Sequence, residues 1–245
     1  MEIGQADSAT TAVNAGSRDG RRRRVLQIVG WTLIWGGIYM FGYVGWLVFG
    51  TDVVNARVQE EAVGQLERDF EAAPPPVVEE VVVEDTVVAR VLEDAPADGT
   101  GFAMLRVPKV GLGAVVFAGV ETETLAKGPG HMPETSLPGQ PGNSVISGHR
   151  TTHGRPFHDF DLLVPGDLVE IDTSIGTHVY MVRDSFIVAP TDVWVTDQRA
   201  GAWLTFTTCN PKYSARERLI VTAELVSGPN FEYIASQSEP AEPAA

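Results

Sequence analysis

The sequence contains a single cysteine, Cys209, among its 245 residues. An internal disulfide bond is therefore excluded, and the one thiol is either a small buried apolar group or a free reactive side chain. The count alone does not separate these two interpretations, so the residues around Cys209 have to decide between them.

Basic residues are also scarce. Lysine and arginine together number 18 against 32 acidic residues, the formal net charge is −14, and only three of the basic residues are lysines. Such a chain repels phosphate backbones, which argues against nucleic acid as a partner. The imbalance is concentrated in residues 51–100, with 13 acidic and 3 basic side chains, a pattern typical of a solvated, self-repelling spacer.

Charge of either sign is absent from residues 25–50. A helix needs about 20 apolar residues to cross the hydrocarbon core of a membrane, and Arg21–Arg24 directly precede this longer run. A cleavable signal peptide would have an apolar region of about 7–15 residues and a small-x-small cleavage site, and no Ala-x-Ala closes this one. We therefore predict an uncleaved, single-pass anchor in the cell membrane, with a cytoplasmic N-terminus and the rest of the chain extracellular.

These features divide the chain into five predicted parts. They are a cytoplasmic basic tail (1–24), a transmembrane signal anchor (25–50), an acidic extracellular spacer (51–100), a compact domain (101–228) and a disordered tail (229–245). Within the spacer, apolar residues four apart from Val54 to Phe70 indicate a short helix, which prolines from Pro74 onward end. For Val77 to Val91, an edge strand and a disordered tether are both open.

The compact domain is rich in short runs of valine, isoleucine and aromatic residues, separated by glycine and proline. Many short strands at this spacing are typical of an all-β sandwich or barrel. Two short helical stretches fit between them, near residues 121–127 and 157–163. The predicted strands are Phe102–Val107, Leu112–Phe117, Ser144–Gly148, Leu168–Asp172, His178–Asp184, Trp203–Thr208 and Arg218–Val226.

Cys209 follows one of these strands directly, and Asn210-Pro211 then stops it. A residue at a strand end faces a groove more readily than one in mid-strand. Along this strand Leu204 and Phe206 share one face and Cys209 falls on the other, which favours the reactive interpretation without excluding the buried one. Only the thiolate attacks well, and a free cysteine titrates near about 8.5, so a base or cation is needed nearby.

Two side chains could serve as the base or cation near Cys209. His149 ends the run Ser144–Gly148, and Arg218 begins the last predicted strand. A cysteine, a histidine and an arginine provide a nucleophile, an acid–base group and a fixed cation for acyl transfer. Taken singly, His149 also fits a structural histidine and Arg218 a surface arginine. Arg216 is a rival for the cationic role, but it lies in the loop before the strand.

A metal site is the alternative use of the histidines. His149, His153 and His158 are close in sequence, but intervening glycine and proline residues break any helix that would align them. No nearby cysteine or acidic cluster completes a ligand set. We therefore predict neither a metal nor another cofactor.

Three motifs in this domain resemble those of sortases. The run Leu204–Cys209 resembles the Thr-Leu-x-Thr-Cys signature, Gly148–Arg150 the histidine motif, and Arg218–Ala223 the strand of the catalytic arginine. The wider runs 138–143, 148–154 and 208–211 resemble class E, the actinobacterial type. The likeness covers residues 101–228 and keeps the order histidine, cysteine, arginine.

The resemblance implies a closed eight-stranded sortase β-barrel as the catalytic domain. Cys209 would attack the Thr–Gly bond of an LPXTG- or LAXTG-like sorting motif near the C-terminus of a secreted protein, forming a thioacyl intermediate. An amine of a peptidoglycan precursor would resolve it. His149 would move the protons, Arg218 would hold the oxyanion or the substrate backbone, and Thr208 would help to line the pocket.

Two departures from the class E pattern concern substrate choice. Met132 stands in Gly130–Pro133 where class E members commonly have a tyrosine implicated in the preference for alanine in the motif, and Phe206 replaces the signature leucine. Met132 is therefore a candidate substrate-binding residue, and whether this chain prefers alanine in the motif is open. A catalytically inactive wall-binding module and a thiol protease that only hydrolyses are the alternative functions, because the same acyl-enzyme serves transfer and hydrolysis.

Overall fold

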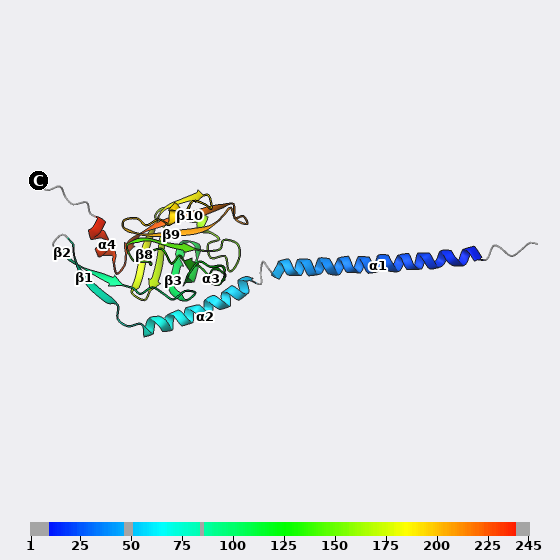
Figure 1. Ribbon diagram of the computed structural model, residues 1–245, viewed down its shortest axis with the longest axis horizontal. Helices are drawn as coiled ribbons and strands as arrows, with labels where there is room; N and C mark the ends of the chain where they lie inside the picture. The colour runs from blue at the N-terminus through cyan, green and yellow to red at the C-terminus, as the bar shows by residue number, and fades with distance from the viewer. Residues whose placement is uncertain (1–9, 47–50, 84–85, 239–245) are drawn as a thin grey trace, which may run out of the picture. The chain divides into compact units, whose positions relative to one another are not determined.

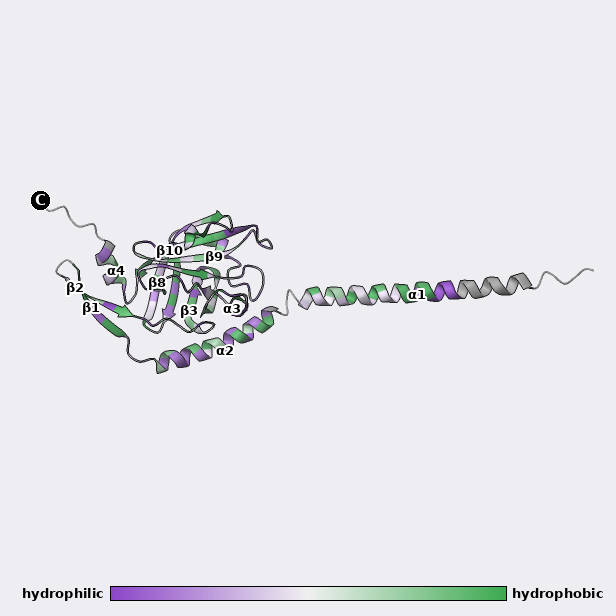
Figure 2. Ribbon diagram, viewed as in Figure 1, coloured by the Kyte–Doolittle hydropathy of each residue, from purple (hydrophilic) through white to green (hydrophobic). Residues whose placement is uncertain are grey.

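The computed structural model describes residues 10–46, 51–83 and 86–238. The chain divides into two compact units, one ending at Gly50 and the other beginning at Thr51. In the first unit α1 (Thr10–Gly45) is a single helix. Its stretch Arg21–Gly45 has a mean hydropathy of 1.4, has no buried side chains and is long enough to cross a membrane. Figure 2 shows α1 as largely hydrophobic after a strongly hydrophilic turn, the pattern of a membrane anchor preceded by arginines.

The second unit is built on a closed barrel of eight strands, which confirms the predicted fold class (Figure 1). The strands run around the barrel in the order β10-β8-β7-β3-β4-β5-β6-β9, and β9 pairs with β10 to close it. Most neighbours are antiparallel, whereas β4 with β5 and β6 with β9 are parallel pairs. The bounds are β3 (Gly101–Val107), β4 (Leu112–Ala118), β5 (Gly130–His131), β6 (Gly142–Ser147), β7 (Leu168–Thr173), β8 (Gly176–Val188), β9 (Ala202–Asn210) and β10 (Glu217–Ser227).

Period-two alternation explains why these segments are strands. On β8, the side chains of His178, Tyr180 and Val182 are fully buried while the residues between them are partly exposed. Burying each large apolar side chain contributes about 1.5–3 kcal/mol. Inside the barrel Phe157 stacks on Phe160 with ring centroids 4.2 Å apart, and Phe206 meets both edge-on.

The short helices lie between strands. Of the two predicted stretches, one is α3 (Thr122–Lys127) and the other contains the 3-10 helix η3 (Phe160–Leu162). Two more 3-10 turns are η2 (Pro108–Val110) and η4 (Val193–Thr196). Phe157 and Phe160 therefore lie on a turn between strands. Their rings enter the barrel core.

The predicted helix of the acidic region is present and longer than expected. Helix α2 (Thr51–Ala72) lies along the barrel beside β3 and β4 (Figure 1). Leu66 is 3% exposed and packs with Val115 and Phe117 of β4. This part of the predicted spacer is an ordered cover on the barrel, because the apolar stripe of the helix finds an apolar outer surface.

The remaining spacer segment forms paired strands, which decides between the two open possibilities. Strands β1 (Val77–Val83) and β2 (Thr86–Leu92) form an antiparallel ribbon. The ribbon is docked at Val91, whose N–H donates to Asn230 Oδ1 at 2.7 Å and whose carbonyl accepts from Asn230 Nδ2 at 3.0 Å.

Helix α4 (Phe231–Ser238) replaces part of the tail that we predicted to be disordered. Tyr233 and Ile234 are 7% and 6% exposed, and the guanidinium of Arg90 lies 5.5 Å from the Tyr233 ring centroid. The two apolar residues pack against the core, which the Pro/Ala/Glu composition of the whole tail concealed. Residues 239–245 lie outside the described residues.

Candidate active site

Cys209 and Arg218 are direct neighbours across two strands. In the antiparallel pair of β9 and β10, Arg218 stands opposite Cys209. Residues opposite each other in such a pair have Cβ atoms about 4.5–5.5 Å apart and project to the same face of the sheet. The thiol and the guanidinium therefore leave the barrel wall side by side.

His149 reaches the same end of the barrel from the other side of β9. Strands β6 and β9 are parallel, with Ser147 beside Thr207. The Gly148 N–H continues the ladder by donating to the Thr207 carbonyl at 3.1 Å. His149 lies two residues after Ser147, and Cys209 lies two residues after Thr207. Both residues therefore lie at the same end of the β6–β9 pair.

The face of β9 that carries Cys209 is the outer one. Leu204 and Phe206 are 0% and 1% exposed within the core, whereas Thr207 and Cys209 are only half-buried. The alternation predicted from sequence is thus present. Cys209 is therefore only partly buried at the end of its strand, which favours the reactive interpretation over that of a small core residue.

Thr208 does not line this outer face. Its side chain is 4% exposed, and its hydroxyl donates to the Gly148 carbonyl at 2.7 Å. Alternation turns the Thr208 side chain inward, and its expected part in lining the substrate pocket stays a prediction. This side chain links the ends of β6 and β9, immediately next to His149 and Cys209.

The environment of His149 favours a neutral imidazole. The ring is half-buried and stacks on His153 with centroids 4.7 Å apart and an angle of 27° between the planes. Burial, followed by repulsion from the neighbouring imidazole, lowers the pKa of His149 below its ordinary value. At neutral pH the ring is therefore unprotonated and can accept a proton.

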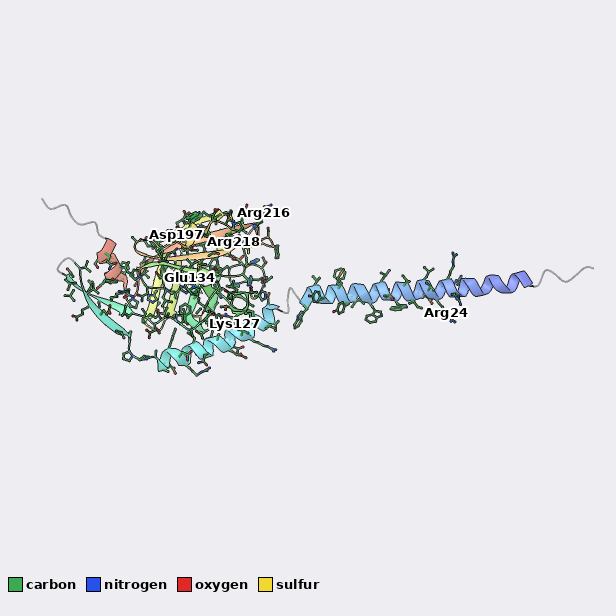
Figure 3. The ribbon with its side chains drawn as sticks, viewed as in Figure 1. Arg24, Lys127, Glu134, Asp197, Arg216 and Arg218 are labelled. Atoms are coloured by element: carbon green, nitrogen blue, oxygen red, sulfur yellow. The ribbon has the colours of Figure 1, made fainter. Side chains whose placement is uncertain are left out.

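Arg218 is oriented by its own loop. Nη1 donates to the carbonyls of Ala215 at 2.9 Å and Glu217 at 3.0 Å. A guanidinium has five N–H donors, and within the described residues those on Nε and Nη2 make no hydrogen bond. Figure 3 shows its rival, Arg216, at the loop end of the hairpin, where it is exposed. The geometry therefore favours Arg218 over Arg216 as the partner of Cys209.

Arg150 is a functional candidate that sequence reasoning missed. Its side chain is 3% exposed, and Nη2 lies 3.1 Å from Asp161 Oδ1. Nη1 donates to the Cys209 carbonyl at 3.1 Å and to Asn210 Oδ1 at 2.7 Å. Arg150 thus binds the end of β9 to the segment of His149. Its place beside His149 in the histidine motif was the available signal, but sequence gave no sign that it is buried.

Met132 lies away from the thiol. Its N–H donates to the Val145 carbonyl at 2.9 Å, and Val145 stands beside Thr205, four residues before Cys209. At about 3.3 Å per residue this is about 13 Å along the strand, the span of about four residues of an extended peptide. Any contact of Met132 with a substrate would therefore involve residues several positions from the reacting bond.

His158, the third histidine of this region, has surroundings of its own. His158 Nδ1 lies 2.9 Å from the Arg150 carbonyl oxygen. Among the residues that the structure describes, no group of three or more His, Cys, Asp or Glu side chains is arranged to hold a metal ion.

Comparison with known proteins identifies the family. A sortase domain model matches residues 105–226, most of the barrel. Sortase SrtE1 of Streptomyces coelicolor is 32% identical over 144 residues, which are 52% of this chain and 41% of that protein. Sortase SrtE2 of the same organism is 26% identical over 233 residues, covering 84% of this chain and 87% of that protein.

A solved structure agrees with these matches. Sortase E from Streptomyces avermitilis has 35% identity and a TM-score of 0.51, and the match covers 60% of this chain and 98% of that one. The fold and the matches define a sortase-type barrel. The chain belongs to the sortase family, and its relatives support class E.

Proposed function

We propose that this sortase cleaves an LPXTG- or LAXTG-like motif near the C-terminus of a secreted protein, between threonine and glycine, and joins the threonine to an amine of the cell wall. The observation that carries this proposal is the strand register. Arg218 is opposite Cys209, and His149 leaves the neighbouring parallel strand at the same end.

The first half-reaction forms a thioester. His149 takes the proton of Cys209, and the thiolate attacks the carbonyl carbon of the threonine residue. Free donors of Arg218 stabilise the oxyanion of the tetrahedral intermediate without changing protonation. The C–N bond then breaks, and the imidazolium of His149 gives its proton to the departing glycine amine.

The second half-reaction restores the enzyme. His149 accepts a proton from the incoming amine, whose nitrogen attacks the thioester carbonyl. The C–S bond breaks as the new amide bond forms, Cys209 leaves as the thiolate, and the imidazolium of His149 returns a proton to it. His149 thus acts first as base and then as acid in each half-reaction.

The membrane topology supports a role at the cell surface. Arg21–Arg24 precede the apolar stretch of α1, and such clusters stay in the cytoplasm. We infer that α1 is a single-pass anchor and that the barrel lies outside, where secreted proteins and peptidoglycan precursors are its partners. Thr208 would support the site from inside and Met132 would contact the motif upstream of its threonine.

A product assay tests the function. The detergent-solubilised full chain is incubated with peptides carrying each motif, with and without a triglycine amine. We expect ligated product when the amine is present and none with Cys209→Ala. Cleavage that persists in Cys209→Ala would refute the nucleophile. Free acid as the only product would favour a hydrolytic protease, and no reaction with either peptide would favour a binding module.

A further inference from the structure

Helix α2 reaches the loop that carries the proposed acid–base histidine. Near the start of the helix, Asp52 Oδ1 accepts a hydrogen bond from the Gly154 N–H at 3.0 Å. Its other oxygen, Oδ2, lies 3.2 Å from Arg155 Nε. One carboxylate thus binds two consecutive residues of the turn that follows His149.

The bound turn has an unusual backbone. His153, Gly154 and Arg155 are consecutive and have φ angles of 52°, 76° and 51°. Side-chain-bearing residues rarely adopt this left-handed conformation, so it persists only where neighbours hold it. At Gly154 a Cβ atom would lie 2.1 Å from Asn55 Oδ1, so α2 also fills the space beside the turn.

The position of α2 is fixed independently of this turn. Asn55 Nδ2 donates to the carbonyls of Ala126 at 3.0 Å and Lys127 at 2.8 Å. Gln59 accepts from the Val115 N–H at 2.7 Å and donates to the Lys127 carbonyl at 2.8 Å. Figure 3 places Lys127 beside α2. Together with buried Leu66, these contacts make the helix a firm support.

The turn delivers His153 onto His149. Their rings stack at 4.7 Å, and the buried Nδ1 of His153 has no hydrogen-bond partner among the described residues. The backbone of the turn and the stack therefore fix the His153 ring. A contact chain runs from Asp52 through the turn to His153 and on to His149.

We propose that Asp52 and His153 are positioning residues of the transpeptidase, and that α2 is thereby a working part of its active site. Asp52 holds the 153–155 turn, and the turn presses His153 against His149 so that the acid–base imidazole keeps its orientation. This inference rests on the proposed function for its kinetic consequences, but its structural consequence at His149 is measurable without substrate.

The charges around His149 define what release of the turn would do. His153 faces it from its own loop, Cys209 lies on β9 and Arg218 on β10, while Asp52 and Arg155 pair with each other behind His153. Burial and His153 hold the pKa of His149 low. Release of the turn removes both effects, so the pKa of His149 rises and protonation disables it at a higher pH.

The test compares variants of the full chain in detergent. In Asp52→Ala we expect kcat to fall roughly tenfold with KM little changed, as for a displaced catalytic group, and the pKa of His149, followed by NMR of labelled histidine, to rise. Asp52→Asn keeps an acceptor for the Gly154 N–H, so its kcat and its His149 pKa should lie between those of the wild type and those of Asp52→Ala. The control is Asp69→Ala, on the same helix, where Asp69 is exposed and within the described residues bonds only Gln65.

Variants of His153 leave the contacts of α2 intact and cover the case in which Asp52→Ala does not fold. His153→Ala should reproduce the loss of kcat and the rise in the pKa of His149, and His153→Phe, which keeps a stacked ring, should recover most of kcat. Lower thermal stability with unchanged kcat and unchanged His149 pKa in the Asp52 and His153 variants would overturn the inference. A wild-type chain that forms no acyl-enzyme would overturn the proposed function instead.

Discussion

At the scale of single residues, the site depends on two arginines with different tasks. Arg218 lies at the rim, and its Nε and Nη2 make no hydrogen bond within the described residues, while Arg150 is buried and binds Cys209, Asn210 and Asp161. The first can bind the reacting acyl group, whereas the second fixes the backbone that presents the thiol.

Replacing Arg218 by lysine should remove most of the activity. An ammonium cannot copy the fork of donors, and removal of an oxyanion donor costs about 100-fold or more in kcat. Steady-state transpeptidation with a sorting-motif peptide measures the effect, and Arg216→Lys, in the exposed loop, serves as control. Near-normal rates in Arg218→Lys would refute the assigned role.

Arg150→Gln should destabilise the fold far more than a matched surface change. Arg150 is 3% exposed and its loss leaves the Cys209 carbonyl and Asn210 without their donor, which costs about 1–3 kcal/mol for each buried unsatisfied group. Arg183→Gln breaks the exposed pair with Glu224, worth at most about 1 kcal/mol. Urea unfolding measures both, and equal losses would contradict the structural role of Arg150.

At the scale of elements, the three predicted catalytic residues all lie at strand ends. Cys209, His149 and Arg218 each flank a run with clear β pattern, so their convergence needed only the barrel to close. The burial of Arg150 and the stacking of His153 depend on contacts between distant segments and on a left-handed turn. No local pattern encodes either, so sequence reasoning missed them.

Helix α2 likewise has one feature that the sequence predicted and one that it did not. Spacing by four predicted the helix correctly, but the acidic charge around it suggested a solvated spacer. In the structure Val58, Ala62 and Phe70 of that stripe pack with Leu66 against β4, while the charged side chains of the helix other than Asp52 are exposed. Helix α4 was missed because only a few apolar residues within a disorder-prone composition pack on the barrel.

Leu66→Ala should loosen α2 from the barrel. A buried leucine replaced by alanine typically costs about 2–5 kcal/mol, so amide hydrogen exchange should accelerate throughout Thr51–Ala72 while the barrel strands stay protected. Leu162, which is 57% exposed, provides the control in Leu162→Ala. Unchanged protection of α2 would show that Leu66 does not hold the helix.

At the scale of the whole molecule, one buried histidine makes stability depend on pH. His178 is fully buried, and this burial lowers its pKa to about 4, against a small opposing effect of Asp172. In the unfolded chain His178 takes up a proton at about pH 6.5. The free energy of unfolding therefore falls as the pH drops from about 6.5 to 4. The loss is on the order of 3 kcal/mol.

Urea unfolding of the wild type at pH 7 and pH 4.5, compared with His178→Phe, measures this contribution. The wild type should lose more stability than the variant over this range, because phenylalanine does not titrate. The same pH dependence in both proteins would show that other groups dominate.

The intact mass of the full chain tests the central claim, that Cys209, His149 and Arg218 act on one carbonyl. After incubation with a sorting-motif peptide and no amine, the wild type should gain the mass of the peptide up to its threonine, located at Cys209 and released by hydroxylamine. His149→Ala and Arg218→Ala should show little or none. An equal adduct in these variants, or one at another residue, would contradict the account.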